Sequence, residues 1–171
     1  KVLWIRSAAT TPMAKAKTGA LIVIRQQHDL GQFIETGIKI DGRISSQLLI
    51  NIFEKNTPLH DGAVIVRGDR VVSATCYLPL TDSLDISKDL GTRHRAAVGI
   101  SEVSDSLTIV VSEETGKVSI AMGGELYRNV DAEFLKNKLI FIQKREQDNS
   151  TIKSWGRRLK DAAKNRKESN E

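Results

Sequence analysis

The stretch that most constrains the fold of this chain runs from Asn56 to Leu80. Within it, residues 63–66 read Ala-Val-Ile-Val, a short apolar run rich in β-branched residues that is typical of a strand covered on both faces. Gly68-Asp69 follows as a two-residue reversal of the kind that closes a hairpin. A second strand is expected over residues 70–78. A hairpin inside the core favours a mixed sheet over a purely parallel one.

The rest of the chain alternates between strand and helix patterns. Further strands are predicted over residues 19–24 and 107–111, and a partly exposed one over 117–122, where apolar residues alternate. Helices are predicted over 29–33, from Ser45 or Ser46 through Phe53, and from Asp131, as N-cap, to Ile142. The pattern predicts one α/β domain in which a central mixed β-sheet is flanked by helices.

Composition agrees with a single globular domain. A chain of 171 residues is long enough to bury a core, and 40% hydrophobic with 27% charged residues is ordinary for a globular protein. Cys76 is the single cysteine, which excludes an internal disulfide framework, and its strand context makes it a small core residue. A zinc site built from Cys76 and the histidines is disfavoured because no paired ligand spacing is present.

The positive charge of the chain is concentrated at one end. Residues 143–171 hold nine Lys or Arg against five Asp or Glu, a net charge of +4 out of the chain's +5. We expect this tail to be an exposed helix or disordered, with contact to an anionic membrane surface as a minor role. A nucleic-acid-binding module that uses the tail is an alternative, but the nearly neutral body and the scarcity of aromatic residues argue against it.

His60-Asp61-Gly62 stands directly before the first strand of the hairpin. A carboxylate beside an imidazole, followed by a glycine that permits close backbone approach, suits a ligand-binding loop at a strand end. The alternative is an ordinary turn, for which an Asp-Gly pair is common.

A second polar cluster opens the run Gly91-Thr92-Arg93-His94-Arg95. Thr92 is the expected N-cap of a helix, which places the three basic residues in its first turn. Positive side chains there oppose the helix dipole, while free backbone N–H groups and guanidinium groups bind phosphate well. The run therefore indicates either a phosphate site or a solvated basic turn.

Together the two clusters resemble the paired Asp-Gly-Ala and Arg-His-Arg motifs of diadenylate cyclases, in particular the membrane-anchored bacterial type. The resemblance covers about residues 18–122, and further matching segments are 18–23, 44–58, 77–80 and 111–116. It implies the diadenylate cyclase fold, a catalytic domain over residues 18–142 and an exposed or disordered tail over 143–171. Residues 1–17 are then expected to be a linker or helix that follows a membrane anchor absent from this sequence, at the cytoplasmic face of the bacterial cell membrane.

The reaction implied by the resemblance condenses two ATP molecules into cyclic di-AMP and two pyrophosphates. Each 3′-hydroxyl attacks the α-phosphorus of the other nucleotide, so that positioning and charge neutralisation dominate catalysis. A non-catalytic, adenine-nucleotide-binding regulatory domain is the alternative. Because the product has two-fold symmetry and each site holds one ATP, two protomers are expected to face each other as a homodimer, transient or stable. No nucleic-acid partner is expected.

A divalent metal, Mn²⁺ or Mg²⁺ with Co²⁺ as a further option, is implied as cofactor. Asp61 is expected to hold the metal or to act as the base, and the metal role is favoured because an unperturbed aspartate is a feeble base toward an alcohol. His60 is either a supplementary metal ligand or a hydrogen-bonded loop histidine.

The resemblance also implies roles for the remaining site residues. The implied catalytic set is Asp61, Gly62, Arg93, His94 and Arg95. Thr92, Arg93 and Arg95 would bind the triphosphate with His94 nearby, Ser112 a phosphate oxygen, and Glu113 a metal or an Arg. Tyr77 and Leu78 would hold adenine, and Gly62 would let the backbone approach the nucleotide. The first strand departs from many relatives, which end it in Glu-Arg, because here Ile24 is followed by Arg25-Gln26-Gln27. That departure leaves no family role for an acid at this position.

Overall fold

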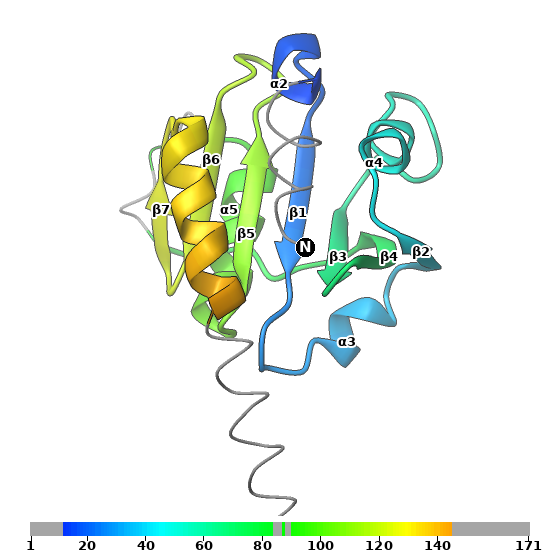
Figure 1. Cartoon of the computed structure of the whole chain (residues 1–171), viewed down its shortest axis with the longest axis horizontal. Coiled ribbons are helices and arrows are strands. Elements are labelled where there is room, and N and C mark those ends of the chain that lie inside the picture. The colour runs from blue at the N-terminus through cyan, green and yellow to red at the C-terminus, as the bar shows by residue number, and fades with distance from the viewer. Residues whose placement is uncertain (1–11, 84–86, 88–89, 145–171) are drawn as a thin grey trace, which may run out of the picture.

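A seven-stranded mixed sheet forms the centre of the molecule, in the strand order β2-β4-β3-β1-β5-β6-β7 (Figure 1). The structure is a computed structural model that describes residues 12–83, 87 and 90–144. Its strands are β1 (Ala20–Ile24), β2 (Ile38–Arg43), β3 (Ala63–Arg67), β4 (Arg70–Cys76), β5 (Leu107–Val111), β6 (Val118–Met122) and β7 (Glu125–Tyr127). β1 pairs with β3 in parallel, and the five other strand pairings of the sheet are antiparallel. The predicted mixed sheet is confirmed.

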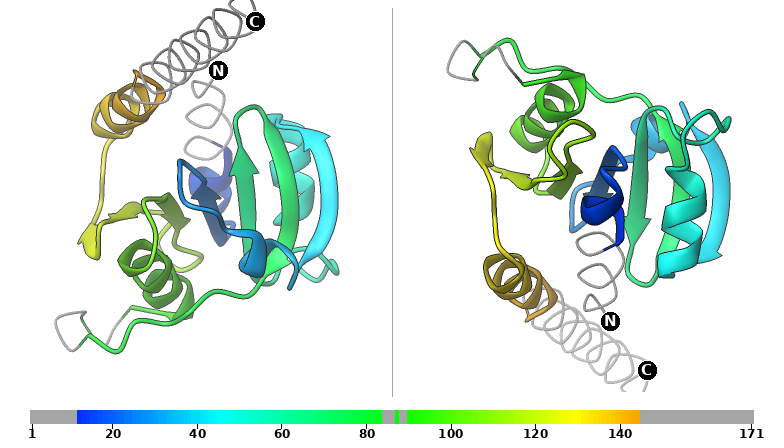
Figure 2. Two further views of the ribbon diagram at one scale, coloured as in Figure 1. Left: turned by 90° about the horizontal axis from the view of Figure 1, so that it is seen from below. Right: turned by 90° about the horizontal axis from the view of Figure 1, so that it is seen from above.

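Helices cover both faces of this sheet (Figure 2). They are α2 (Pro12–Ala16), α3 (Gly31–Ile34), α4 (Ser46–Ile52), α5 (Thr92–Glu102) and a helix over residues 132–144. α4 and the helix over 132–144 pack on one face, where Leu49, Ile52, Leu135 and Leu139 join a buried cluster with alternate strand residues. α5 packs on the opposite face, so the α/β architecture is layered as expected.

β1 lies in the middle of the sheet, and all five of its residues are buried. Ala20, Ile22 and Ile24 contribute to the cluster beneath α4, whereas Leu21 and Val23 contribute to the cluster beneath α5. A strand covered on both faces requires an uninterrupted apolar run, which this segment has.

The predicted hairpin is present, as are the predicted N-caps of α4 and of the helix over 132–144. Ala63 pairs with Cys76 and Arg67 with Arg70, and the reversal between β3 and β4 places Gly68 at a φ of +61°. The hydroxyl of Ser45 accepts a hydrogen bond from the backbone N–H of Leu48 at 3.1 Å and thereby caps α4. Asp131 caps the helix over 132–144 by accepting from the N–H of Phe134 at 2.7 Å. Cys76 is a buried free thiol, and burial raises its pKa.

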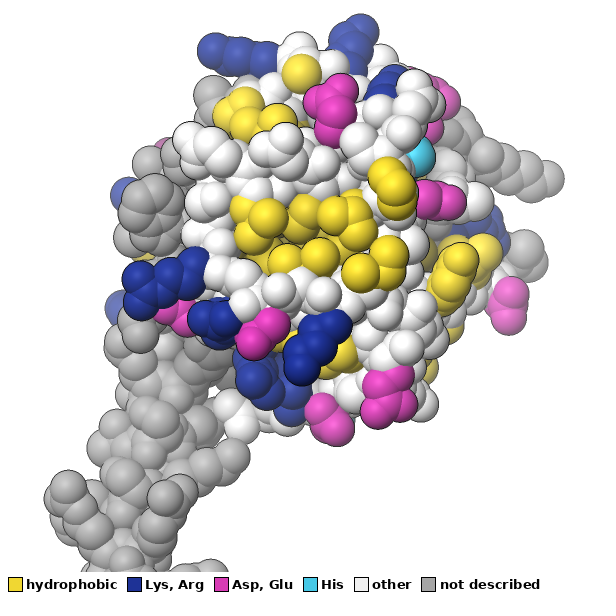
Figure 3. Space-filling model, turned by 90° about the vertical axis from the view of Figure 1, so that its right-hand side faces the viewer, with side chains coloured by type: hydrophobic (Ala, Val, Ile, Leu, Met, Phe, Trp, Pro, Cys, Tyr) yellow, Lys and Arg dark blue, Asp and Glu magenta, His cyan; other side chains and the backbone are white. Residues whose placement is uncertain are grey.

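The structure differs from the sequence predictions at three strands near the edges. β2, which lies on the side of the molecule that Figure 3 shows, was not predicted because it is an edge strand without a buried residue, and it is interrupted by a register shift between Lys39 and Gly42. β7, at the other edge, has only three residues and was not predicted either. β6 was predicted to be partly exposed, yet its first four residues are buried because α5 and the helix over 132–144 cover its two faces.

Two of the expected chain divisions fall largely outside the described residues. Of the linker expected over residues 1–17, the structure describes 12–17, where α2 forms, and almost all of the basic tail expected over 143–171 lies outside the description. No helix among the described residues is both long and apolar enough to cross a bilayer.

Candidate active site

The predicted site residues gather at one end of the sheet, the upper end in Figure 1. β1 and β3 both begin there because they run parallel, and β4 and β5 end there because each is antiparallel to one of them. Ala63 pairs with Cys76, so Asp61-Gly62 and Tyr77-Leu78 extend past the sheet at this same end of the strands. Ala20 pairs with Val111, which brings Ser112 and Glu113 to this end as well. Strand pairing therefore unites segments that are far apart in the sequence.

The start of α5 lies beside the end of β5. The N-cap is Gly91, in an extended conformation with φ −70° and ψ 176°, and its carbonyl accepts hydrogen bonds from the N–H groups of His94 and Arg95 at 3.1 and 3.3 Å. Thr92 is already inside the helix, so its prediction as N-cap was wrong by one residue. The cap carries no side-chain hydrogen bond. Arg93, His94 and Arg95 occupy the first turn as predicted, and no acidic residue balances them there.

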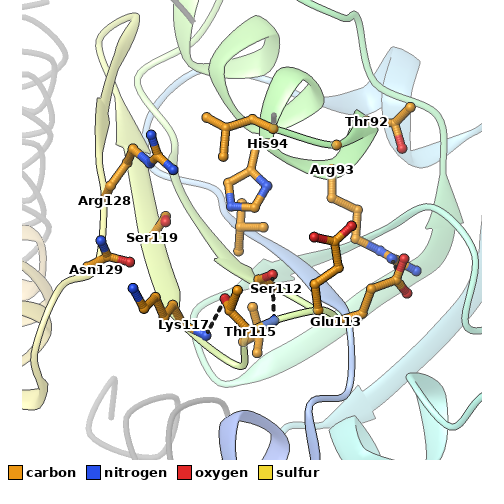
Figure 4. A pocket seen from close by; sticks show the side chains of 15 residues that line it. Thr92, Arg93, His94, Ser112, Glu113, Thr115, Lys117, Ser119, Arg128 and Asn129 are labelled. Atoms are coloured by element: carbon orange, nitrogen blue, oxygen red, sulfur yellow. Dashed lines mark hydrogen bonds and ion pairs between the residues drawn. The ribbon is translucent and has the colours of Figure 1, made fainter. Parts of the chain in front are cut away.

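A cavity of about 250 Å³ opens between this helix start, the end of β5 and the strand β6 (Figure 4). Five of the predicted residues line it: Thr92, Arg93, His94, Ser112 and Glu113. The other predicted residues lie outside its lining: His60, Asp61, Gly62, Tyr77, Leu78 and Arg95. The second motif thus forms a concave site with the β5 end, while the first motif stands at the same end of the sheet without lining that cavity.

Arg93 and Glu113 form the charged contact of this cavity. The Nη1 atom of Arg93 lies 3.1 Å from an Oε2 oxygen of Glu113, and the two side chains are 22% and 51% exposed. Of the two roles expected for Glu113, metal ligand or Arg partner, the structure has the second. The guanidinium fits beside Gly19 only because residue 19 has no side chain: a Cβ at that position would lie 2.7 Å from Nη1 of Arg93. The Arg93 side chain is therefore held at the cavity before any ligand arrives.

The turn from β5 to β6 fixes Ser112. Its backbone N–H donates to the carbonyl of Lys117 at 3.0 Å, and its Oγ accepts from the N–H of Thr115 at 3.2 Å. A hydroxyl carries one donor in addition to two acceptor lone pairs, so the Ser112 O–H keeps a proton for an acceptor in the cavity. A phosphate oxygen is such an acceptor.

Arg95 is directed away from the cavity. Its Nη2 donates to the carbonyl of Thr81 at 3.0 Å, and the N–H of Thr81 donates to the carbonyl of Arg95 at 3.1 Å. This pair of hydrogen bonds holds the segment that follows Tyr77 and Leu78 against α5. In this structure Arg95 positions the expected adenine-binding segment and does not face the expected phosphate site.

Tyr77 and Leu78 offer an apolar surface at the sheet end. The Tyr77 side chain is 70% exposed although its backbone N–H is fixed by Thr36 Oγ1 at 2.9 Å. Leu78 is half-buried against the cluster beneath α5. An exposed aromatic ring on an anchored backbone suits stacking against a purine.

His60 and Asp61 form a short polar pair on the loop before β3. Nδ1 of His60 lies 2.6 Å from the carbonyl of Thr57, and because a carbonyl only accepts, Nδ1 carries the proton. With its proton on Nδ1, a neutral imidazole has its lone pair on Nε2, the arrangement found in metal-binding histidines. Asp61 is exposed, and one of its oxygens accepts from the N–H of Gly62 at 3.0 Å.

This pair fits a divalent cation only in part. Among the described residues, no group of three or more His, Cys, Asp or Glu side chains is placed to hold a metal ion. An imidazole nitrogen and a carboxylate would need the remaining ligands from water or from a substrate's phosphate oxygens, which is how Mg²⁺ and Mn²⁺ are often held.

Gly62 has a structural reason to be glycine. Its φ is +89°, and a Cβ there would lie 2.9 Å from the carbonyl carbon of Thr75 and 3.0 Å from the oxygen of Cys76. The backbone at Gly62 was expected to approach the nucleotide closely; in the structure it packs closely against the backbone at the end of β4. Thr75 itself has a φ of +58°, which is rare for a β-branched residue, so the loop and the end of β4 form a tightly constrained unit.

One wall of the cavity was not predicted from the sequence. Lys117, Ser119, Arg128 and Asn129 line it from the side of β6 and β7. Ser119 could have been noticed as a hydroxyl on an apolar strand had β6 been recognised as buried. Arg128 and Asn129 follow the three-residue strand β7, which is too short to be predicted from its pattern.

Comparison with known proteins gives a consistent result. Residues 7–126 match the DAC family model, described as DisA bacterial checkpoint controller nucleotide-binding. The chain is 54% identical over 143 residues to the cyclic di-AMP synthase CdaA of Bacillus subtilis, and 59% identical over 132 residues to a diadenylate cyclase of Listeria monocytogenes. These alignments cover 84% and 77% of this chain but 52% and 48% of the relatives, so the chain spans about half the length of the curated relatives it matches.

Solved structures share the fold. A double mutant of DacA from Staphylococcus aureus superimposes with a TM-score of 0.80 at 50% identity, covering 82% of this chain and 93% of that one. A protein from Bacillus cereus described as a hypothetical membrane-spanning protein superimposes with a TM-score of 0.72 at 45% identity, covering 75% of this chain and 63% of that one. The sheet and helices described above are therefore those of an experimentally observed fold.

Proposed function

We propose that this chain, which belongs to the diadenylate cyclase (DAC) family, condenses two molecules of ATP into cyclic di-AMP and two pyrophosphates. The observation that carries the proposal is the meeting, at one end of one sheet, of a cationic helix start, a fixed serine hydroxyl, an exposed tyrosine and a His-Asp pair. A single domain thus offers side chains for the phosphates, for the adenine ring and for a metal ion.

The phosphates belong at the start of α5. The N–H groups of its first turn point toward the helix end, and Thr92, Arg93 and Ser112 add a hydroxyl, a guanidinium and a second hydroxyl. Glu113 balances Arg93 in the absence of nucleotide. When a triphosphate binds, the guanidinium of Arg93 donates hydrogen bonds to phosphate oxygens, either in place of the Glu113 carboxylate or in addition to it. His94 lines the same cavity.

The reacting atoms belong at the loop before β3. In the proposed reaction, a bond forms between a 3′-oxygen and the α-phosphorus of the facing nucleotide, and the bond from that phosphorus to the β-phosphate oxygen breaks. The hydroxyl proton is released to solvent, and pyrophosphate leaves with the electron pair. Asp61 orients the hydroxyl, and Nε2 of His60 with the Asp61 carboxylate would hold a divalent cation such as Mn²⁺, Mg²⁺ or Co²⁺. Such an ion supplies charge neutralisation at the phosphates.

Two protomers are needed for a product with two-fold symmetry. We propose that two copies face each other through the nucleotide-bearing end of the sheet, each providing one ATP and one set of phosphate ligands. The specific activity should then rise with enzyme concentration in a dilute range. A rate strictly proportional to monomer, in a protein shown to stay monomeric during turnover, would exclude this arrangement.

We also propose that the protein acts at the cytoplasmic face of the cell membrane. The support is that the relatives are about twice the length of the match and that one solved relative is described as membrane-spanning. The catalytic part is assigned to residues 18–142, within which all of the proposed site residues lie.

A non-catalytic nucleotide-binding domain is the second candidate. The observation that favours it is that Asp61 does not line the cavity that gathers the phosphate ligands. Incubation with ATP and Mn²⁺ or Mg²⁺, followed by mass analysis, separates the two. Cyclic di-AMP in the mixture supports the cyclase, whereas ATP-protected melting without any dinucleotide product supports the second candidate.

A further inference from the structure

The wall of the cavity that faces α5 from β6 belongs to neither motif. Ser119 pairs with Val110 in the sheet and therefore lies directly across from the end of β5. Arg128 and Asn129 border the same space beyond β7, and Lys117 borders it at the end of the turn from β5 into β6 (Figure 4). The cavity thus continues past the residues to which the cyclase reaction has been assigned.

Ser119 is the most informative residue of this wall. Its side chain is 3% exposed, it lines the cavity, and none of the hydrogen bonds of the described residues involves its hydroxyl. The Ser119 hydroxyl is not among the fully buried, unsatisfied polar atoms of the described residues, which means that it opens onto the cavity and is not sealed in the core. Because a hydroxyl carries one donor and two acceptor lone pairs, Ser119 can donate a hydrogen bond to a group that enters the cavity.

The charges around the cavity indicate what that ligand is. Arg93, Lys117 and Arg128 line it together with the carboxylates of Glu113 and Glu114. Arg93 already interacts with Glu113. The dipole of α5 adds a positive end at the same place. An anion with several oxygen acceptors can accept hydrogen bonds from the serine hydroxyl and from the cationic side chains together, and a cation or an apolar ligand cannot.

The size of the cavity indicates which part of the nucleotide it holds. At about 250 Å³ it is smaller than the roughly 300–1,000 Å³ of sites that enclose a whole organic ligand. The expected adenine surface of Tyr77 and Leu78 lies outside its lining. The cavity consequently suits the phosphate end of ATP, away from the base.

We propose that Ser119, together with Arg128 and Lys117, binds the β- and γ-phosphates of ATP, the pair that leaves as pyrophosphate. This inference rests on the proposed cyclase function and adds to it the residues that select a triphosphate over a monophosphate. It also assigns these residues the retention of pyrophosphate after the bond to the α-phosphorus has broken. Ser119 and Arg128 are accordingly binding residues of the leaving group.

The test is calorimetric titration of the intact chain with inorganic pyrophosphate and, separately, with AMP. Ser119→Ala and Arg128→Gln should each weaken pyrophosphate binding by about tenfold or more, the usual effect of losing a hydrogen bond to a charged group, and leave AMP binding unchanged. Thr108→Val is the matched control, because Thr108 of β5 carries a buried hydroxyl that has no partner in the described part of the chain and does not line the cavity. It should bind pyrophosphate as the original chain does.

Two results would overturn the inference. One is the absence of measurable pyrophosphate binding to the original chain, and the other is equal pyrophosphate affinity in Ser119→Ala and the original chain. Melting temperatures of the variants identify any loss of folding. Pyrophosphate binding that depends on Ser119 in a protein that forms no cyclic di-AMP would refute the cyclase and retain this site. If the protein forms cyclic di-AMP but binds pyrophosphate equally well without the Ser119 hydroxyl, the cyclase function is retained and this pyrophosphate site is refuted.

Discussion

Replacing Gly19 with alanine should damage the phosphate site without unfolding the protein. The new Cβ would lie 2.7 Å from Nη1 and 3.1 Å from Cζ of Arg93, and 3.1 Å from Cβ of Glu113. The atom that must move is the end of a flexible side chain, and Gly19 has no positive φ that would strain an alanine. Arg93 is therefore expected to swing away from Glu113 while β1 keeps its place.

The two consequences of Gly19→Ala differ in size. The Arg93–Glu113 pair is partly exposed, and such pairs contribute about 0.2–1 kcal/mol to the free energy of unfolding. That corresponds to a fall in melting temperature of at most about 4 °C in a chain of this length. A lost hydrogen bond between Arg93 and a phosphate costs about 1.5–3 kcal/mol of binding free energy, or at least about a tenfold rise in the Kd for ATP.

Calorimetry with ATP and thermal melting measure both quantities. Gly42→Ala is the control, because its Cβ would meet Leu48 and Ile40 at 3.4 and 3.5 Å, which is ordinary contact, on a strand at the far edge of the sheet. Gly19→Ala and Arg93→Ala should be non-additive for ATP binding, since both act through one guanidinium. Unchanged ATP affinity in Gly19→Ala, or an effect that adds fully to that of Arg93→Ala, would refute the reasoning.

Three further predictions concern the fold and the reaction. Asp61→Asn should abolish cyclic di-AMP in mass analysis yet keep ATP binding and the melting temperature, because the side chain is exposed; product at the original rate would remove Asp61 from the mechanism. Gly99→Ala should cost about 1–3 kcal/mol or more in denaturant unfolding, because the Cβ would collide with the carbonyl oxygen of Pro79 and lie 2.9 Å from the N atom of Thr81, both backbone atoms; a stability equal to that of the original chain would contradict this packing. Burial raises the pKa of the Cys76 thiol in the fold, so the resulting stability is complete below the unfolded-state pKa and is lost as pH rises through the folded one. Iodoacetamide at pH 8 should accordingly label native Cys76 far more slowly than the unfolded chain, and equal labelling rates would show that the thiol is accessible.

The central part of the fold was predictable because its signals are local. Residues 63–70 carry an apolar run and a Gly-Asp reversal, and these are sufficient to form β3 and its turn. Ser45 and Asp131 are N-caps whose side chains reach the backbone three residues on. None of these features depends on distant parts of the chain.

Most of what the sequence did not predict depends on distant parts of the chain. The edge strand β2 forms because β4 offers it a pairing edge, a cause that its own residues do not contain. The N-cap of α5 is the local exception: Gly91, not Thr92, adopts the extended cap conformation, and it does so without a side-chain hydrogen bond. Ser119 became a site candidate only once α5 was seen to cover β6.

The convergence of the two motifs was predictable from order and resemblance, but its geometry was not. The sequence does not state that β1 and β3 are parallel neighbours or that β5 returns beside β1, and these pairings bring Asp61 and Ser112 to one end of the sheet. The direction of the Arg95 side chain could not be predicted either, because its hydrogen-bond partner is the backbone carbonyl of Thr81.

The most direct test of the account is a crystal structure of this chain with an ATP analogue that lacks the 3′-hydroxyl and therefore cannot react. We expect one nucleotide per protomer, with its phosphates at Arg93 and Ser112, its base on Tyr77 and its sugar next to Asp61. A nucleotide whose phosphates lie elsewhere, or whose base and phosphates never reach both motifs of one protomer, would contradict the claim that a single site unites them.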